Sequence, residues 1–145
     1  MQVDRSAGPN SSACNWQPVT DNINEMDKTF RFLKFKVYQD AKLFYRRIVV
    51  ITRKFPREYW ELGDQMRRSS LSVILNIAEG AGKDSDKEFN RYLNNSLGSI
   101  NETAAGIDVS YDAKLISETE RDSLLEEAKD IANQLGGFSK RLKSS

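Results

Sequence analysis

The sequence predicts an all-α protein, folded as an antiparallel up-down-up-down four-helix bundle. Three long segments repeat apolar residues at alternating spacings of four and three, which is typical of helices that bury one stripe in a bundle. Two Ser-x-x-Glu sequences lie where new helices are expected to begin. The connections between the segments are short, which favours antiparallel neighbours, and we find no strand pattern or strong internal repeat.

The overall composition is that of a single globular domain. The chain has 145 residues, of which 39% are hydrophobic and 30% charged, and its mean hydropathy is −0.61. No apolar run approaches the roughly 20 residues that a membrane span needs, and no apolar stretch at the N-terminus indicates a signal peptide. The single cysteine, Cys14, excludes an internal disulfide and fits a reducing cytoplasm.

Histidine is absent from the chain. This absence excludes Ser-His and Cys-His nucleophile systems, and with one cysteine it argues strongly against a zinc site. An enzyme here would need carboxylates, lysines or a borrowed cofactor. We therefore expect no catalytic residues, no metal and no cofactor.

Residues 1–29 show no apolar periodicity and are rich in Ser, Asn, Pro and Thr, so we expect a disordered tail followed by a bundle domain over residues 30–145. Met26 is an alternative start to Met1, because it lies close to the structured part.

The first helix begins near Val37, and Pro56 ends it because the residue before a proline is disfavoured in the α region. The second helix runs from about Leu62 to Gly80, and its stretch SLSVILNIAEG is apolar almost all round. A bundle core covers only one stripe, so the surplus predicts oligomerisation. The expected oligomer interface on the second helix is Leu71, Ile74 and Leu75. The buried stripe expected on the first helix is Val37, Ala41, Phe44, Ile48, Ile51 and Phe55.

The sequence EGAGKDSDKEF predicts a helix end, a turn and a helix start. Gly80 and Gly82 suit a helix end that needs a positive φ, and Ser85 with Glu88 forms a capping box. The alternative, a phosphate-binding loop, needs a strand before the glycines and Ser or Thr after the lysine. Here a helix precedes, and Asp84 follows the lysine, so nucleotide binding is disfavoured.

The third helix runs from about Asp86 to Tyr111, and small residues on it allow another helix to approach closely. A second capping box, Ser117 with Glu120, begins the fourth helix. The buried stripe expected on the third helix is Phe89, Leu93, Ser96, Ile100, Thr103 and Ile107, and the small residues of that helix are Gly98, Ala104, Ala105 and Gly106. The buried stripe expected on the fourth helix is Leu124, Ala128, Ile131, Leu135, Phe138 and Leu142.

The stretches QMRRSSLSVILNIAEGAGKDSDKEFNRYL, NNSLGSINET and LKFKVYQDA together resemble the four-helix bundle family of 23S rRNA-intervening sequence proteins. The resemblance covers residues 30 to 143 and implies a ring-like homopentamer of bacterial origin. A related group, the accessory proteins of diversity-generating retroelements, binds a reverse transcriptase and nucleic acid. The matching residues are Gln65, Arg67, Arg68, Ser72, Asn76, Ile77, Ala78, Glu79, Gly80, Phe89, Arg91, Leu93, Leu97, Gly98, Ser99 and Glu102.

Asn76 and Glu79 lie three residues apart on one helical face. They could line a polar pocket, or they could join a buried hydrogen-bonded network that fixes helix register, because a buried carboxylate needs a partner. We favour the network. Its expected members are Gln65, Arg67, Arg68, Asn76, Glu79, Gly80, Arg91 and Glu102.

Charge is divided between helices: residues 30–57 carry nine Lys or Arg against one acid, and residues 84–112 carry six acids against two bases. The basic face could be solvated, could pair one subunit with another, or could bind RNA or single-stranded DNA. The candidate nucleic-acid contacts are Lys34, Lys36, Lys42, Arg46, Arg47, Arg53 and Lys54.

Three functions are therefore open. The first is a non-enzymatic, homo-oligomeric scaffold or interaction protein with a protein partner. The second is a nucleic-acid-binding accessory protein, and the third, least favoured, is an enzyme with a carboxylate site around Glu79.

Overall fold

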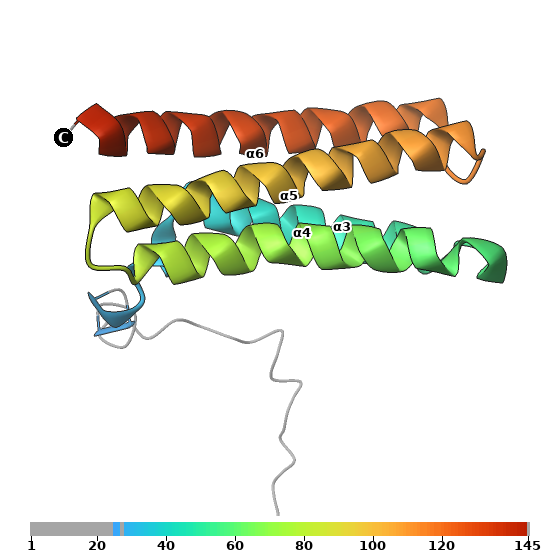
Figure 1. Ribbon diagram of the computed structural model, residues 1–145. Coiled ribbons are helices and arrows are strands. Elements are labelled where there is room, and N and C mark those ends of the chain that lie inside the picture. The colour runs from blue at the N-terminus through green and yellow to red at the C-terminus, as the bar shows by residue number, and fades with distance from the viewer. Residues whose placement is uncertain (1–24, 27, 145) are drawn as a thin grey trace, which may run out of the picture.

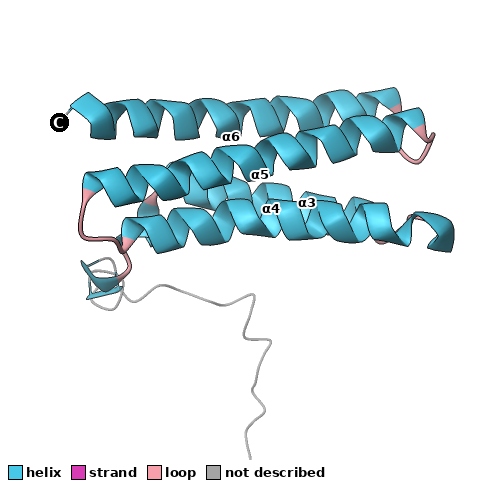
Figure 2. Ribbon diagram, in the orientation of Figure 1, coloured by secondary structure: helices cyan, strands magenta, loops and turns pink. Residues whose placement is uncertain are grey.

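The computed structural model describes residues 25–26 and 28–144, and every regular element among them is helical, as Figure 2 shows. The predicted all-α class is confirmed, with four long helices. The elements are the 3-10 turn η2 (Arg31–Lys34), α3 (Lys36–Thr52), the 3-10 turn η3 (Arg57–Tyr59), α4 (Trp60–Ala81), α5 (Asp86–Asp112) and α6 (Glu118–Ser144).

The four helices pack along one another, and short connections join consecutive helices at alternate ends of the molecule (Figure 1). Each helix packs extensively against the next one in the chain, whereas α3 and α6 touch far less. The α4–α5 pair is the most closely packed. Two edges of the bundle therefore differ: α4 and α5 form a tight edge, and α3 and α6 form a loose one.

The predicted apolar stripes form the core. On α5 all six predicted positions are buried, including the polar Ser96 and Thr103. On α3 the first five predicted residues are buried, and Phe55 lies half-buried beyond the end of the helix. On α6 the stripe ends differently from the prediction, because Phe138 is half-buried and the buried residue of that turn is Ser139.

Side-chain caps fix two helix starts as predicted. The Ser85 Oγ accepts from the Glu88 backbone N at 3.1 Å. At α6 the capping box is complete: the Ser117 Oγ accepts from the Glu120 N at 3.1 Å, and the Ser117 N donates to Glu120 Oε1 at 2.9 Å. These bonds satisfy backbone donors that the first turn of a helix leaves without a partner.

The predicted helix end is confirmed, because α4 ends at Ala81 with Gly82 as its C-cap, but the positive φ predicted for Gly80 and Gly82 is wrong. Gly82 has a φ of −91°, and no glycine in the described part of the chain has a positive φ. Gly80 is buried inside α4, where an added Cβ would lie 2.6 Å from the Tyr92 Cβ and 3.0 Å from Phe89 Cδ1. Gly80 is therefore needed for the close approach of α4 and α5. The left-handed conformation appears instead at Lys114, with a φ of 63°, in the turn before α6.

Aromatic rings tie the start of α3 to the end of α6. The Phe35 and Phe138 rings are 5.1 Å apart between centroids, and Phe138 is equally close to Phe89 of α5. Arg31 closes this end of the bundle, because its guanidinium lies 5.2 Å from the Phe89 ring and its Nε donates to the Ala81 carbonyl at 3.0 Å.

Most of the predicted tail, residues 1–29, lies outside the described residues, as do Met1 and Cys14. Among the helices that the structure describes, none is both long and apolar enough to cross a membrane.

Candidate interaction surfaces

The predicted polar residues of α4 and α5 meet along the outer side of that helix pair. The Gln65 amide donates to the Glu102 carboxylate. Further along α4, Asn76 Nδ2 donates to the Ser72 carbonyl at 2.9 Å and to its hydroxyl at 3.0 Å, and the Ser99 hydroxyl donates to the Ser72 hydroxyl at 2.9 Å. These bonds join α4 to α5 by polar side chains at the rim of the core.

Glu79 lies apart from Asn76, in an exposed position near the end of α4. Its carboxylate accepts from the Tyr92 hydroxyl at 3.1 Å and lies 3.9 Å from the Lys83 Nζ. The Tyr92 ring is also flanked by two cations, Lys83 at 5.1 Å and Arg91 at 4.6 Å from its centroid. The carboxylate is therefore part of a solvated cluster at the α4–α5 turn. Glu79 also lines an open hollow of about 590 Å³ between α4 and the segment around Arg31.

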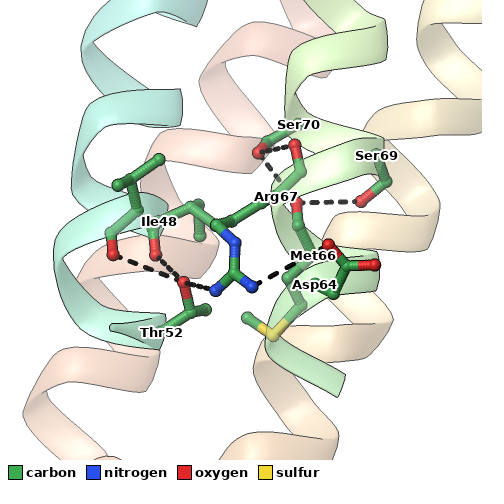
Figure 3. A network of polar contacts seen from close by, with 8 residues as sticks. Ile48, Thr52, Asp64, Met66, Arg67, Ser69 and Ser70 are labelled. Carbon is green, nitrogen blue, oxygen red and sulfur yellow. Dashed lines mark hydrogen bonds and ion pairs between the residues drawn. The ribbon is translucent and has the colours of Figure 1, made fainter. Parts of the chain in front are cut away.

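Arg67 points the other way, towards α3 (Figure 3). Its Nη1 donates at 2.9 Å to the buried Thr52 hydroxyl, which in turn donates to the Ile48 carbonyl at 2.7 Å. Its Nη2 lies 3.8 Å from an Asp64 oxygen, and its guanidinium lies 5.8 Å from the Trp60 ring. Arg67 thus links α3 to the start of α4.

The remaining members of the predicted network are on the surface. Arg91 donates to Glu88 twice at 3.2 Å, and these hydrogen bonds lower the pKa of Glu88 and raise that of Arg91. Arg68 is exposed on α4. The eight predicted residues therefore form separate groups between different helix pairs and not one buried network around Glu79.

Hydroxyl pairs inside the α4–α5 interface are the polar feature that sequence reasoning did not identify. The Ser69 and Thr103 hydroxyls are 2.6 Å apart and both are buried, and the Ser96 hydroxyl donates to the Val73 carbonyl at 2.9 Å. The sequence did contain a sign of these bonds, because the predicted buried stripe of α5 includes two hydroxyl residues, Ser96 and Thr103, among apolar ones. A buried hydroxyl needs a partner, which here is on the facing helix.

Several of the seven candidate nucleic-acid contacts are engaged within the chain. Lys36 donates to Asp40 at 2.6 Å, Arg47 pairs with Glu127 of α6, and the Lys42 Nζ lies 5.0 Å from the Tyr38 ring. Burial opposes ionisation of Asp40, but hydrogen bonds from Lys36 and Gln134 outweigh it and lower the pKa of that carboxyl. Five of the seven candidates are exposed and have no carboxylate within ion-pair distance among the residues that the structure describes: Lys34, Lys42, Arg46, Arg53 and Lys54.

A groove of about 620 Å³ lies along the loose edge between α3 and α6. Its α3 side presents Leu43 and Val50, with 54% and 48% of their surface exposed, together with Arg46 and Lys54. Such exposure of large apolar side chains beside unpaired cations marks a surface suited to a partner.

The outer side of α4 carries the predicted oligomer contacts. Leu71 and Leu75 are 36% and 55% exposed, whereas Ile74 is only 6% exposed and belongs to the chain's own core. Ile74 is therefore not an interface residue of the folded chain, and the apolar surplus of α4 consists of the two leucines.

The side chains on these surfaces offer hydrogen bonds, ion pairs and apolar contacts. Over residues 25–26 and 28–144 no cluster of Cys, Asp and Glu could hold a metal ion. The shifted pKa values belong to surface ion pairs, including Arg121, whose pKa is raised by its hydrogen bond to Asp122.

The chain matches a known protein family. The family model described as "23S rRNA-intervening sequence protein" matches residues 33–137, which include all four long helices in whole or in large part. No curated protein matches the chain.

Proposed function

We propose that this chain, which belongs to the 23S rRNA-intervening sequence protein family, is a non-enzymatic scaffold or interaction protein of the cytoplasm that works as a ring-like homo-oligomer. In this proposal each subunit is an antiparallel up-down-up-down bundle, and the family resemblance suggests five subunits to a ring.

The exposure of Leu71 and Leu75 carries the proposal. The chain already has a complete core of its own, in which α4 contributes Val73, Ile74 and Ile77. The two leucines lie on the opposite side of the same helix, where 36% and 55% of their surface stays exposed in the folded subunit. Fully burying an exposed leucine stabilises by roughly 1.5–3 kcal/mol. Because Leu71 and Leu75 are only partly exposed, burying each against a second subunit would contribute a fraction of that amount.

The test is light scattering coupled to size exclusion on the wild-type chain and on Leu71→Asp/Leu75→Asp. We expect the wild type to elute as an oligomer and the double variant as a folded monomer with unchanged helical circular dichroism. A monomeric wild-type chain would overturn the proposal.

A matched control is available on the same helix. Arg68 is exposed and one turn from Leu71, so Arg68→Asp adds a comparable charge without removing apolar surface. It should weaken assembly less than either leucine substitution. Ile74→Asp is unsuitable, because it would put a charge into the core and unfold the subunit.

A second candidate function, binding of RNA or single-stranded DNA, is favoured by one observation. Arg46, Arg53 and Lys54 are exposed on and just after α3 without a carboxylate partner in the described part of the chain, so they are free to contact phosphates. Lys36 and Arg47 are neutralised by Asp40 and Glu127 and would contribute less.

This candidate predicts retention on heparin that falls steeply with salt, since each phosphate contact releases counterions. Arg46→Glu/Lys54→Glu should abolish retention, whereas Lys36→Glu should have a small effect. Equal loss from all three substitutions would indicate a general effect of net charge, and no retention of the wild-type chain would remove the candidate.

A further inference from the structure

We propose that subunits assemble through a heterologous contact in which the α3 side of one copy docks on the α5 side of the next. This inference rests on the proposed homo-oligomeric function and names the surfaces that build it.

The donating surface is the α3 stripe, which we define as Leu43, Arg46, Val50 and Lys54. These residues follow one another at spacings of three and four, so they lie along one side of the helix and its C-terminal end. All four are exposed and line the groove on the loose edge of the bundle. The stripe alternates a large apolar side chain with a cation that has no ion pair among the described residues.

The receiving surface is the α5 stripe, which we define as Gly98, Glu102, Ala105 and Asp108. These residues are also exposed and follow at spacings of four and three. The stripe alternates a very small residue with a carboxylate. It is thus the complement of the α3 stripe in both size and charge.

Gly98 has no role inside the subunit that explains it. An added Cβ there would have no atom within 4 Å, in contrast with Gly80 and Gly106, where Tyr92 and Met66 fill the space. Gly136 on α6 is open in the same way, so an open glycine alone does not mark a contact; at Gly98 the open space lies in line with Glu102 and Asp108, and a partner helix could approach closely there.

The two stripes match in register. In Figure 1 the colours show that α3 and α5 run in the same direction along the bundle. If Leu43 lies level with Gly98, then Val50 lies level with Ala105, because both pairs are seven residues apart. In the same register Arg46 comes within one residue of the level of Glu102, and Lys54 comes within one residue of the level of Asp108.

Leu71 and Leu75 fall beside the same contact. The bonds between Ser72 and Ser99 and between Gln65 and Glu102 show which parts of α4 and α5 lie level with each other. By that correspondence the two leucines lie level with the Gly98 end of the α5 stripe. A leucine that docks at Gly98 from the next copy would therefore lie at the same height along the bundle as these two exposed leucines.

The contact is heterologous because the two stripes lie on different sides of the subunit. Helices α3 and α5 do not pack against each other, and the loose and tight edges are formed by different helix pairs. Two different patches that meet across copies give a ring when the rotation between copies closes. The proposed ring therefore needs only this one repeated contact.

Cysteine cross-linking tests the contact directly, in the full chain with Cys14→Ser as background. We expect Val50→Cys and Ala105→Cys to form an intermolecular disulfide when both are present, either mixed or in one chain, because their Cβ atoms would be close enough. Neither variant should cross-link with itself. The double variant should give a ladder up to the full oligomer on a denaturing gel.

Three results would overturn the inference. Self-cross-linking of either single variant would indicate a two-fold symmetric contact. An oligomeric wild-type chain whose double variant gives no ladder would place the interface elsewhere and leave the proposed oligomer standing. A monomeric wild-type chain would remove both proposals.

Charge exchange gives a second, independent readout. Arg46→Glu and Glu102→Arg should each weaken association by about tenfold or more, and the combined variant should recover most of the loss. Lys140→Glu, an exposed cation of α6 outside both stripes, should change nothing. Failure of the combined variant to recover, or an equal loss from Lys140→Glu, would contradict the pairing.

Discussion

The two edges of this bundle hold their helices together by different means. At the tight edge, α4 and α5 approach through glycines and hydroxyls: Gly80 lies against Tyr92, and Ser69 meets Thr103 at 2.6 Å inside the interface. At the loose edge, α3 and α6 are linked by long charged side chains, of which Arg47 and Glu127 are the clearest pair.

The two edges should differ in how well they tolerate added side-chain volume and changes of salt and pH. Small residues let two backbones approach, so any added atom at the tight edge must displace a neighbour. Long charged side chains reach across a gap, can adjust their rotamers and are screened by salt. We therefore expect the tight edge to be sensitive to added volume and the loose edge to be sensitive to salt and pH.

The largest expected effect is at Gly80. Gly80→Ala should lower the free energy of unfolding by about 1–3 kcal/mol, because the new methyl group would contact the Tyr92 Cβ and the Phe89 ring. The matched control is Gly136→Ala on α6, where an added Cβ meets nothing within 4 Å. This change should stabilise the chain by up to about 1 kcal/mol, because alanine favours the helix.

Urea denaturation at one fixed protein concentration measures both variants, since the stability of an oligomer depends on concentration. If Gly80→Ala were as stable as Gly136→Ala, the α4–α5 contact would be looser than the structure shows, and the contrast between the two edges would fail.

A smaller effect is expected from the buried hydroxyl pair. Thr103→Val keeps the shape but removes a hydroxyl, so it should cost about 1 kcal/mol of stability by leaving Ser69 with only its bond to the Met66 carbonyl. In the Thr103→Val background, adding Ser69→Ala should lower the free energy of unfolding by less than Ser69→Ala does in the wild-type chain. A double-mutant cycle measures this coupling, and strictly additive losses would show that the two hydroxyls act independently.

At the loose edge the expected effect is smaller still. Glu127→Gln should reduce stability by about 0–1 kcal/mol at low salt, because both partners remain about one-third exposed. The reduction should disappear at about 1 M salt, where screening is nearly complete. The Thr103→Val loss measured in the same salt series should persist, and a Glu127→Gln effect that persists equally would remove the proposed difference between the edges.

The smallest effect is a pH dependence from Asp40. Its pKa is lowered in the folded state, so its contribution to stability is present above the ordinary aspartate pKa and is lost as the pH falls through the lowered value. Asp40→Asn should therefore flatten the decline in stability on the acid side. Unfolding measured over a series of acidic pH values tests this, and an unchanged acid profile would contradict it.

The fold could be predicted from the sequence because the patterns that specify the helices and their starts are local along the chain. The spacing of Leu93, Ile100 and Ile107 specifies a buried stripe wherever the partner helix lies, and the capping box at Ser117 works within one turn. Both features therefore appear in the structure as predicted.

The features that sequence reasoning misplaced depend on the facing helix. Glycine is common at helix ends, yet Gly80 is needed because the Tyr92 side chain on the facing helix leaves no room for a Cβ. Ile74 belongs to an apolar run, but whether it faces the core or a partner depends on the rotation of α4 within the bundle. Likewise, Arg67 bonds to Thr52, a partner that no spacing along the chain reveals.

The aromatic cluster that brings Phe35 beside Phe138 has a practical consequence for the order of the chain. Because α3 begins where α6 ends, a short linker from the region of Ser144 to Phe35 could join these ends, and new termini could be opened in the turn around Lys114 at the far end. Such a circular permutant would keep the four long helices and the contacts between them, but it would replace η2 and with it the Arg31 bond to the Ala81 carbonyl. It would also move any fused label to the opposite end of the bundle.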